Sequence, residues 1–390
     1  MAAQEKYRTN LFTHDRVHAF VDSLFGEDLH AKRVLSLADS TLGVVHAASL
    51  GVHAIGRGLA AARGLADKHA IKQVDRCIGN EKIDMDVVAP LWIAHAVGDC
   101  KEVIVNLDWT EFDDDDQSML VASLQTDHGR ALPLLWKTVV KSKLKGQRND
   151  HEDALLCRLR DAVPRDVRVV IVADRGFGDQ KLFEFLTKLD FHYIIRFRAC
   201  IQVTDQDGVS RAAGDWLGEQ GRLRSLRHAT VTANQTAVGM VVVVHEKNMD
   251  EPWCLVASDP AWSGSWVKQR YGKRFTCEET FRDVKDLHFG FGMSWNPVTQ
   301  PARRDRMMLL ATLAQALLTI LGAAGEAAGI DYLLKANTTK KRTMSLLRQG
   351  IRWYELIPNM PESRLHLLMD SFESLVTQSA LFRALLAVDE

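Results

Sequence analysis

The hydrophobic and polar positions follow a helical period over the first quarter of the chain. Between residues 13 and 98, apolar and alanine-rich stretches recur at helical spacing and are separated by small-residue breaks, which predicts a set of packed helices. Within this stretch Lys68, Lys72 and Arg76 recur every four residues, so one helix carries three positive charges on one face. A face of this kind either contacts anionic groups or is solvated, and the spacing alone favours solvation.

The pattern then changes to short apolar runs bounded by polar turns. Residues 167–173 are dense in β-branched side chains, which is typical of a strand buried on both faces. The predicted elements are strands at 102–110, 118–126 and 130–140, a helix at 150–163, a strand at 167–173, a helix at 180–189 and a strand at 193–198. This order of strand, strand, strand, helix, strand, helix, strand is that of the ribonuclease H fold, an α/β architecture.

The second half of the chain shows two different sequence patterns. Alternating segments predict further strands at 229–236, 238–245 and 253–257. Beyond residue 297 the chain is mostly helical, and the apolar run 307–324 contains polar residues and follows a charged segment, so it predicts a buried helix and no membrane span. The domains expected are a helical region at 1–98, an α/β core at 99–199 and 263–325, a β-rich insertion at 200–262 and a helical C-terminal region at 326–390.

Composition narrows the class of protein. The chain has 390 residues, is 46% hydrophobic and has a net charge of −1, so it holds ordinary packed cores and any contact with nucleic acid must come from local basic patches. The six cysteines show no paired short spacing, which indicates neither a zinc cluster nor a disulfide framework. Because residues 1–12 are mostly polar and lack a signal segment, we expect a cytoplasmic protein with no membrane partner.

One short segment combines four chemically active side chains. Tyr271, Arg274, Glu278 and Lys285 are separated by steps of three, four and seven residues, which on a single helix keeps them within an arc of about 60°. A carboxylate flanked by cations on one face suits a group that holds a divalent metal beside a phosphate backbone. The alternative is a solvated amphipathic helix.

Two further acids stand at the ends of predicted strands. Asp108 ends the apolar run of the first strand and Asp174 follows the buried strand, so with Glu278 three carboxylates come from separate elements. Three such groups can hold two divalent ions for phosphoryl transfer. Strand-end aspartates also cap turns, and Asp39 and the cluster 113–116 are rivals for the first acid.

These residues carry a resemblance to a known family. The spacing Tyr271, Arg274, Glu278 and Lys285 resembles the Tyr-Arg-Glu-Lys signature of bacterial cut-and-paste DDE transposases of the insertion sequence 4 group. The run from Asp174 through Arg175, Gly176 and Phe177 looks like the second-acid motif of that group, and Asp108-Trp109-Thr110 looks like its first-acid motif. The motifs occur in the family order, and the similarity spans residues 102–321.

The resemblance implies an activity and its partners. It implies an endonuclease and recombinase with a ribonuclease H-like core interrupted by the β-rich insertion, which cleaves transposon ends and transfers the 3′ hydroxyl into target DNA. Asp108, Asp174 and Glu278 would be the catalytic and metal-binding residues for two Mg²⁺ ions, which Mn²⁺ can replace. The DNA would carry terminal inverted repeats, and a homodimer near the bacterial nucleoid would hold two ends with residues 1–98.

The same resemblance assigns residues to the DNA. Arg274 and Lys285 would hold phosphates, and Tyr271 would contact the backbone or a base. Arg175, from the second-acid motif, and Trp295, which follows the signature, complete the expected DNA-binding set, and Trp262 or Trp266 could replace Trp295 as the aromatic that stacks on an extruded base. Two rival functions remain, a non-catalytic DNA-binding inhibitor or domesticated regulator, and a structure-specific nuclease without strand transfer.

Overall fold

The computed structural model describes residues 13–247 and 249–377, and the polar segment 1–12 lies outside this range together with the end of the C-terminal region. The first part is helical, as the sequence predicts. Its helices are α2 (His14–Phe25), α3 (Ala31–Ala47), α4 (Val52–Arg63), α5 (Asp67–Gly79) and α6 (Met85–Val97). The Thr13 hydroxyl accepts the backbone N–H of Arg16 and so starts α2 at the predicted boundary.

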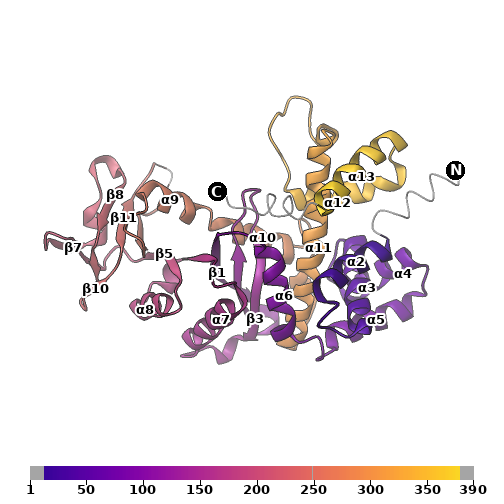
Figure 1. Cartoon of the computed structure of the whole chain (residues 1–390), viewed down its shortest axis with the longest axis horizontal. Coiled ribbons are helices and arrows are strands. Elements are labelled where there is room, and N and C mark those ends of the chain that lie inside the picture. The colour runs from indigo at the N-terminus through magenta and orange to yellow at the C-terminus, as the bar shows by residue number, and fades with distance from the viewer. Residues whose placement is uncertain (1–12, 248, 378–390) are drawn as a thin grey trace.

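An eight-stranded sheet extends from the middle of the protein, at β1 and β3, to its left end, at β8 and β11 (Figure 1). Its order is β3-β2-β1-β4-β5-β12-β11-β8. The strands are β1 (Glu102–Phe112), β2 (Gln117–Leu124), β3 (Leu132–Val140), β4 (Arg168–Ala173), β5 (His192–Phe197), β8 (Arg224–Arg227), β11 (Met240–Val244) and β12 (Trp253–Ala257). Strand β1 pairs antiparallel with β2 and parallel with β4, and β4 pairs parallel with β5. The carboxyl ends of β1 and β4 therefore lie at the same end of the sheet.

The connections between these strands confirm the predicted element order. Helix α7 (Arg148–Ala162) joins β3 to β4, and α8 (Gln180–Lys188) joins β4 to β5. Strand β4 is buried after its first residue, because its Val and Ile side chains pack against both faces of the sheet. The sequence thus predicts the elements from β1 to β5 in type and order.

The β-rich segment after β5 contributes to two sheets. Strands β6 (Gln202–Thr204), β7 (Ser210–Ala212), β9 (Thr230–Val231) and β10 (Thr236–Ala237) form a small four-stranded sheet, whereas β8, β11 and β12 extend the main one. The single strand predicted at 229–236 is wrong. Thr232 and Gln235 have φ values of 68° and 53°, so the backbone turns there and separates β9 from β10.

The prediction of one helix carrying Tyr271, Arg274, Glu278 and Lys285 is also wrong. Tyr271 lies on α9 (Gly264–Gly272), whereas Glu278 and Lys285 lie on α10 (Phe275–Lys285) and Arg274 is its N-cap residue. The break is a tight turn in which the Arg274 N–H bonds the Tyr271 carbonyl at 3.0 Å, three residues back. The four side chains therefore do not lie on a single helix.

The longest helix is the core of the C-terminal half. Among the described residues α11 (Pro301–Ala327) is the one unbroken helix long and apolar enough to cross a membrane, and its apolar window is entirely buried inside the protein. It packs against β3 and α3, and against α12 (Leu346–Leu356) and α13 (Glu362–Thr377). The predicted buried helix is confirmed. A methyl group on Gly350 would lie 1.8 Å from the Leu318 carbonyl oxygen, so glycine allows α12 to cross α11 closely.

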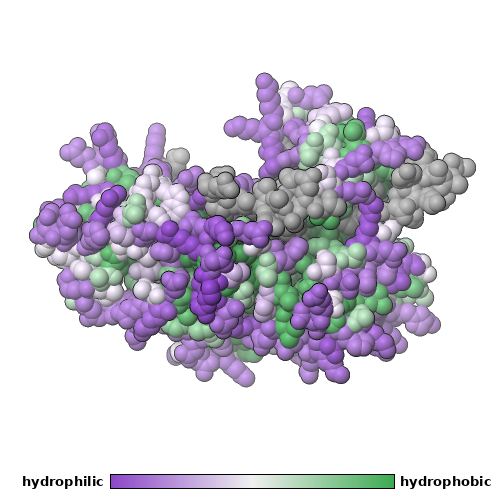
Figure 2. Space-filling model, viewed as in Figure 1, coloured by the Kyte–Doolittle hydropathy of each residue, from purple (hydrophilic) through white to green (hydrophobic). Residues whose placement is uncertain are grey.

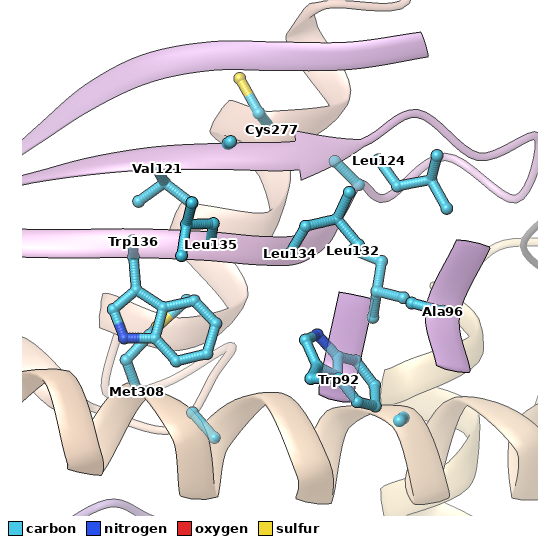
Figure 3. Close-up of a cluster of buried hydrophobic side chains, with 14 of the residues drawn as sticks. Trp92, Ala96, Val121, Leu124, Leu132, Leu134, Leu135, Trp136, Cys277 and Met308 are labelled. Carbon is cyan, nitrogen blue, oxygen red and sulfur yellow. The ribbon is translucent and has the colours of Figure 1, made fainter. Parts of the chain in front are cut away.

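Two tryptophans join the sheet to the helices around it (Figure 3). Trp92 on α6 packs near Leu132 and Leu134, and its indole N–H donates to the Pro133 carbonyl at 2.8 Å. Trp136 on β3 faces α11, where its indole N–H donates to the Asp305 carbonyl at 3.0 Å. Figure 2 shows hydrophilic residues over the outer end of the sheet and over the loop between α11 and α12. The core is therefore continuous from the N-terminal helices through the sheet to α11.

Candidate active site

Asp108 and Asp174 lie side by side on neighbouring strands. The parallel register pairs Leu107 with Ala173, so the next residue of each strand is one of the two acids. Asp174 leaves β4 and caps a short 3-10 turn, where its Oδ1 accepts the Gly176 N–H at 2.8 Å. Burial raises the pKa of Asp108, and the charge of Asp174 raises it further. The fold therefore brings these two carboxylates into electrostatic contact.

Glu278 is linked to Asp108 through an arginine. Arg274 donates from Nη1 to Asp108 Oδ2 at 3.1 Å and from Nη2 to Glu278 Oε1 at 2.7 Å. Arg274 is 6% exposed, whereas the Glu278 side chain is 49% exposed and faces solvent. Although burial opposes ionisation, Asp108 raises the pKa of Arg274, so the guanidinium stays charged. One cation thus connects the first and third predicted acids.

The Cys277 thiol completes the surroundings of Asp108. Its Sγ donates to Asp108 Oδ2 at 3.4 Å, and burial raises the pKa of the thiol, so it stays protonated. Lys285 reaches the same strand further on and donates to the Thr110 hydroxyl at 3.1 Å and the Glu111 carbonyl at 2.5 Å. These contacts hold α10 against β1 and keep Glu278 on the side of the sheet where the aspartates end.

The donor set suits a hard divalent cation, although the acids are not arranged around one. Within residues 13–247 and 249–377, no three His, Cys, Asp or Glu side chains lie close enough together to hold a metal ion. The reason is visible in the contacts, because the Arg274 guanidinium lies between Asp108 and Glu278. Carboxylate oxygens are the ligands that Mg²⁺ prefers, and the repulsion between Asp108 and Asp174 is what a divalent cation relieves. The residue types thus fit such an ion, but Asp108 and Glu278 are both paired with Arg274 in this structure.

The other residues expected at DNA have varied environments. Tyr271 is buried, packs edge-on against Trp253 at a ring-centroid distance of 4.8 Å, and has a pKa raised by burial. Arg175 donates to both carboxylate oxygens of Glu251, at 2.8 and 3.1 Å. Trp295 is 69% exposed, beside a cleft of about 370 Å³ that Lys285 also lines. Of this set, Trp295 is the most open to solvent.

The alternative tryptophans pack against the protein. Trp262 and Trp266 have ring centroids 4.6 Å apart. The Arg168 guanidinium lies 5.4 Å from the Trp262 ring centroid, and that of Arg270 lies 5.4 Å from the Trp266 ring centroid. These contacts give both indoles a structural role between β4 and α9.

The rivals for the first acid bind other partners. Asp39 is buried in α3, where it accepts from Arg63 at 2.7 Å and from Gln73. In the cluster 113–116, Asp113 pairs with Lys141, Asp115 with Arg304, and Asp116 with the Ser142 backbone and hydroxyl. None of these acids contacts Arg274 in the residues that the structure describes, which favours Asp108 as the first acid.

Glu152 is an additional acid that the sequence analysis did not select. It lies on α7 and accepts the Trp109 indole N–H at 2.8 Å, next to Asp108. Burial raises its pKa to about 7, and Asp174 contributes to the rise. A signal was present in the sequence, since Glu152 stands three and four residues before Leu155 and Leu156 and so falls on the apolar face of the helix.

A comparison with known protein families gives one match. Residues 135–317 match a family model described as the transposase DDE domain. The matched range includes Asp174, Arg274 and Glu278 and begins after Asp108. A search of curated proteins gives no match. Over residues 135–317 the chain is therefore similar to transposase DDE domains, and this range holds two of the three acids described above.

Proposed function

We propose that the protein is a transposase of the insertion sequence 4 group, with a ribonuclease H-like core, which cuts transposon ends and joins them to target DNA. The observation that carries the proposal is the convergence of Asp108, Asp174 and Glu278 through the β1–β4 register and Arg274. In the first step the oxygen of water bonds to phosphorus and the bond to the 3′ oxygen breaks. In the second step the freed 3′ hydroxyl attacks a target phosphate and releases a target 3′ hydroxyl.

Asp108 and Asp174 would hold the divalent cations, Mg²⁺ or Mn²⁺, with Glu278 added when Arg274 is released. Two such ions supply Lewis acidity and stabilise charge on the attacking and leaving oxygens. The Glu278 side chain is half exposed, so it can reorient at low cost. Asp108 is held more firmly, because the Trp109 backbone N–H donates to its Oδ1 at 2.9 Å and Cys277 to its Oδ2. The chain therefore supplies two fixed acids and one adjustable acid.

Arg274 would exchange its partners when DNA enters the site. The guanidinium has two parallel donors that now serve two carboxylates, and a DNA phosphate offers the same pair of acceptors. Its Nε is buried and has no hydrogen-bond partner, so one donor is available to an incoming acceptor. Turning to a phosphate frees Asp108 and Glu278 for the cations and places the phosphate next to them.

The DNA end would also contact the N-terminal helices. A cleft of about 700 Å³ between α3 and α5 is lined by Lys32, His69, Lys72 and Arg76 together with neutral side chains. Its cations are arranged on exposed helix faces, where they can reach a phosphate backbone. Trp295 would stack on an unpaired base, and two copies of the chain would hold the two ends of the element, in the cytoplasm.

The test is cleavage and joining by the purified chain. Fragments of DNA from both sides of its own gene are incubated with Mn²⁺ or Mg²⁺, with and without a plasmid target. We expect nicking and joined products, both lost in Asp174→Asn and kept in Asp207→Asn, which removes the same charge from an exposed turn. Binding without nicking would favour the DNA-binding regulator, and nicking without joining would favour the nuclease.

A further inference from the structure

Glu152 connects α7 to the residue next to the first acid. Its Oε1 accepts the Trp109 indole N–H at 2.8 Å, and the Arg148 guanidinium lies 4.9 Å from the Trp109 ring centroid. The indole is therefore fixed both at its N–H and over its ring. The Trp109 backbone N–H in turn donates to Asp108 Oδ1 at 2.9 Å. Hydrogen bonds therefore connect Glu152 to the Trp109 indole, and the Trp109 backbone to the Asp108 carboxylate.

A carboxylate is a costly acceptor at this position. Glu152 is 7% exposed, and a neutral amide oxygen would accept the same indole N–H without burying a charge. The charge of Asp174 lies close enough to make ionisation of Glu152 harder still. Arg148 offsets part of this cost. The acceptor role alone therefore explains the hydrogen bond, and it leaves unexplained why the acceptor is an acid, which carries a negative charge above a pKa of about 7.

The charge has a use if a cation binds beside it. Glu152 and Asp108 each interact electrostatically with Asp174, so the negative potentials of the three acids overlap at that strand end. Repulsion among them is unfavourable in the cation-free protein and becomes attraction to a divalent ion when one is present.

We propose that Glu152 is a positioning residue of the divalent-cation site, which holds Trp109 and hence the Asp108 carboxylate in place and adds its own negative charge to the site without binding the ion. The proposal rests on the proposed function, since it needs a cation at Asp108 and Asp174. A purely structural Glu152 would stabilise the fold equally well as a glutamine.

The experiment measures Mn²⁺ binding to the full chain by titration calorimetry without DNA at pH 8, above the pKa of about 7 that burial gives Glu152. Glu152→Gln keeps the size and the acceptor but loses the charge, and we expect Mn²⁺ affinity to fall about five- to tenfold, the scale of one screened charge. The melting temperature of the cation-free variant should equal or exceed that of the unchanged protein, because repulsion with Asp174 is removed. Asp153→Asn, which removes the same charge one residue further along α7, should bind Mn²⁺ like the unchanged protein.

A second variant tests the connection through the indole. Trp109→Phe keeps an aromatic side chain, although a smaller one, and removes the N–H donor, so Mn²⁺ affinity should fall again. The double change Trp109→Phe with Glu152→Gln should cost less than the two single effects combined. If Glu152→Gln binds Mn²⁺ as tightly as Asp153→Asn, the inference is wrong while the proposed function stands. If the unchanged protein binds no Mn²⁺ more tightly than Asp174→Asn does, the cation site and this inference fall together.

Discussion

The exchange of Arg274 between acids and DNA makes a prediction in which two measured quantities move in opposite directions. In Arg274→Gln the side chain loses its charge and Asp108 loses its cationic partner. The cation-free protein should become less stable, because a buried carboxylate then lies beside Asp174 without compensation. The affinity for Mn²⁺ in the absence of DNA should rise, since no resident cation competes for Asp108 and Glu278.

The size of both effects follows from the burial of the partners. Breaking a buried ion pair by removing one partner costs about 3–5 kcal/mol, and a half-exposed partner such as Glu278 adds less than about 1 kcal/mol. Asp108 can relieve part of this cost by binding a proton, because its pKa is already raised, so we expect about 3 kcal/mol. With an unfolding entropy of about 2.1 cal/mol/K per residue over 390 residues, this loss lowers the melting temperature by about 4 °C. The gain in Mn²⁺ affinity should be about tenfold, as for the loss of one competing charge.

The assay compares three proteins by thermal unfolding and by Mn²⁺ titration. Arg282→Gln is the matched control, because Arg282 lies on α10, the helix that Arg274 precedes as N-cap residue, and pairs with Glu279 at the surface, at 3.1 Å. It should unfold within about 1 °C of the unchanged protein, since surface pairs contribute little. In Arg274→Gln, saturating Mn²⁺ should recover more stability than in the control, because ligand binding stabilises the folded state in proportion to its affinity. A variant that binds Mn²⁺ more weakly than the control would refute the competition between Arg274 and the cation.

Two further predictions concern α11, where two adjacent charged side chains are buried. Arg304→Ala should destabilise the protein by about 3–5 kcal/mol, because the Arg304 guanidinium donates to Gln117 Oε1 at 2.6 Å and pairs with Asp115. Chemical denaturation measures the lost free energy of unfolding, and a change under about 1 kcal/mol would contradict the reasoning. Burial raises the pKa of Asp305 to about 6, so its ionisation destabilises the fold, and stability is lost as pH rises from about 4 through 6. Asp305→Asn keeps an acceptor for the Thr138 N–H and should remove this loss of stability. The variant should therefore be more stable than the unchanged protein at pH 8 and no more stable at pH 4. Equal stabilities at pH 8 would contradict this prediction.

The parts of the fold that the sequence predicts are those specified by local pattern. Strand β12 has the predicted bounds, and β1 to β5 appear in the predicted order, because each is an apolar run bounded by turn residues. Asp174 was placed correctly at a strand end for the same reason. The membership of β8, β11 and β12 in the main sheet was missed, since pairing between strands distant in the chain depends on register and packing that no local pattern records.

In the candidate site, too, local spacing predicts some features and contacts between distant residues determine the others. Spacing alone selected Arg274 and Glu278, but it could not show that the guanidinium also reaches Asp108, because that contact joins residues 166 positions apart. The signature was expected on one helix, and the turn before Phe275 gives Tyr271 a different environment from Glu278. Side-chain roles that depend on partners from several elements required the three-dimensional arrangement.

The position of Arg274 also links the binding of DNA to the binding of cations. If a DNA phosphate draws the guanidinium away from Asp108 and Glu278, each ligand removes an obstacle to the other, because the cation needs the acids free and the phosphate needs the guanidinium free. Coupling of binding free energies is reciprocal, so DNA must raise Mn²⁺ affinity by the same factor by which Mn²⁺ raises DNA affinity. In Arg274→Gln that factor should fall toward one, because the acids are free from the start. Titrating Mn²⁺ with and without the flanking DNA measures the factor, and an undiminished coupling in the variant would assign the linkage to other residues.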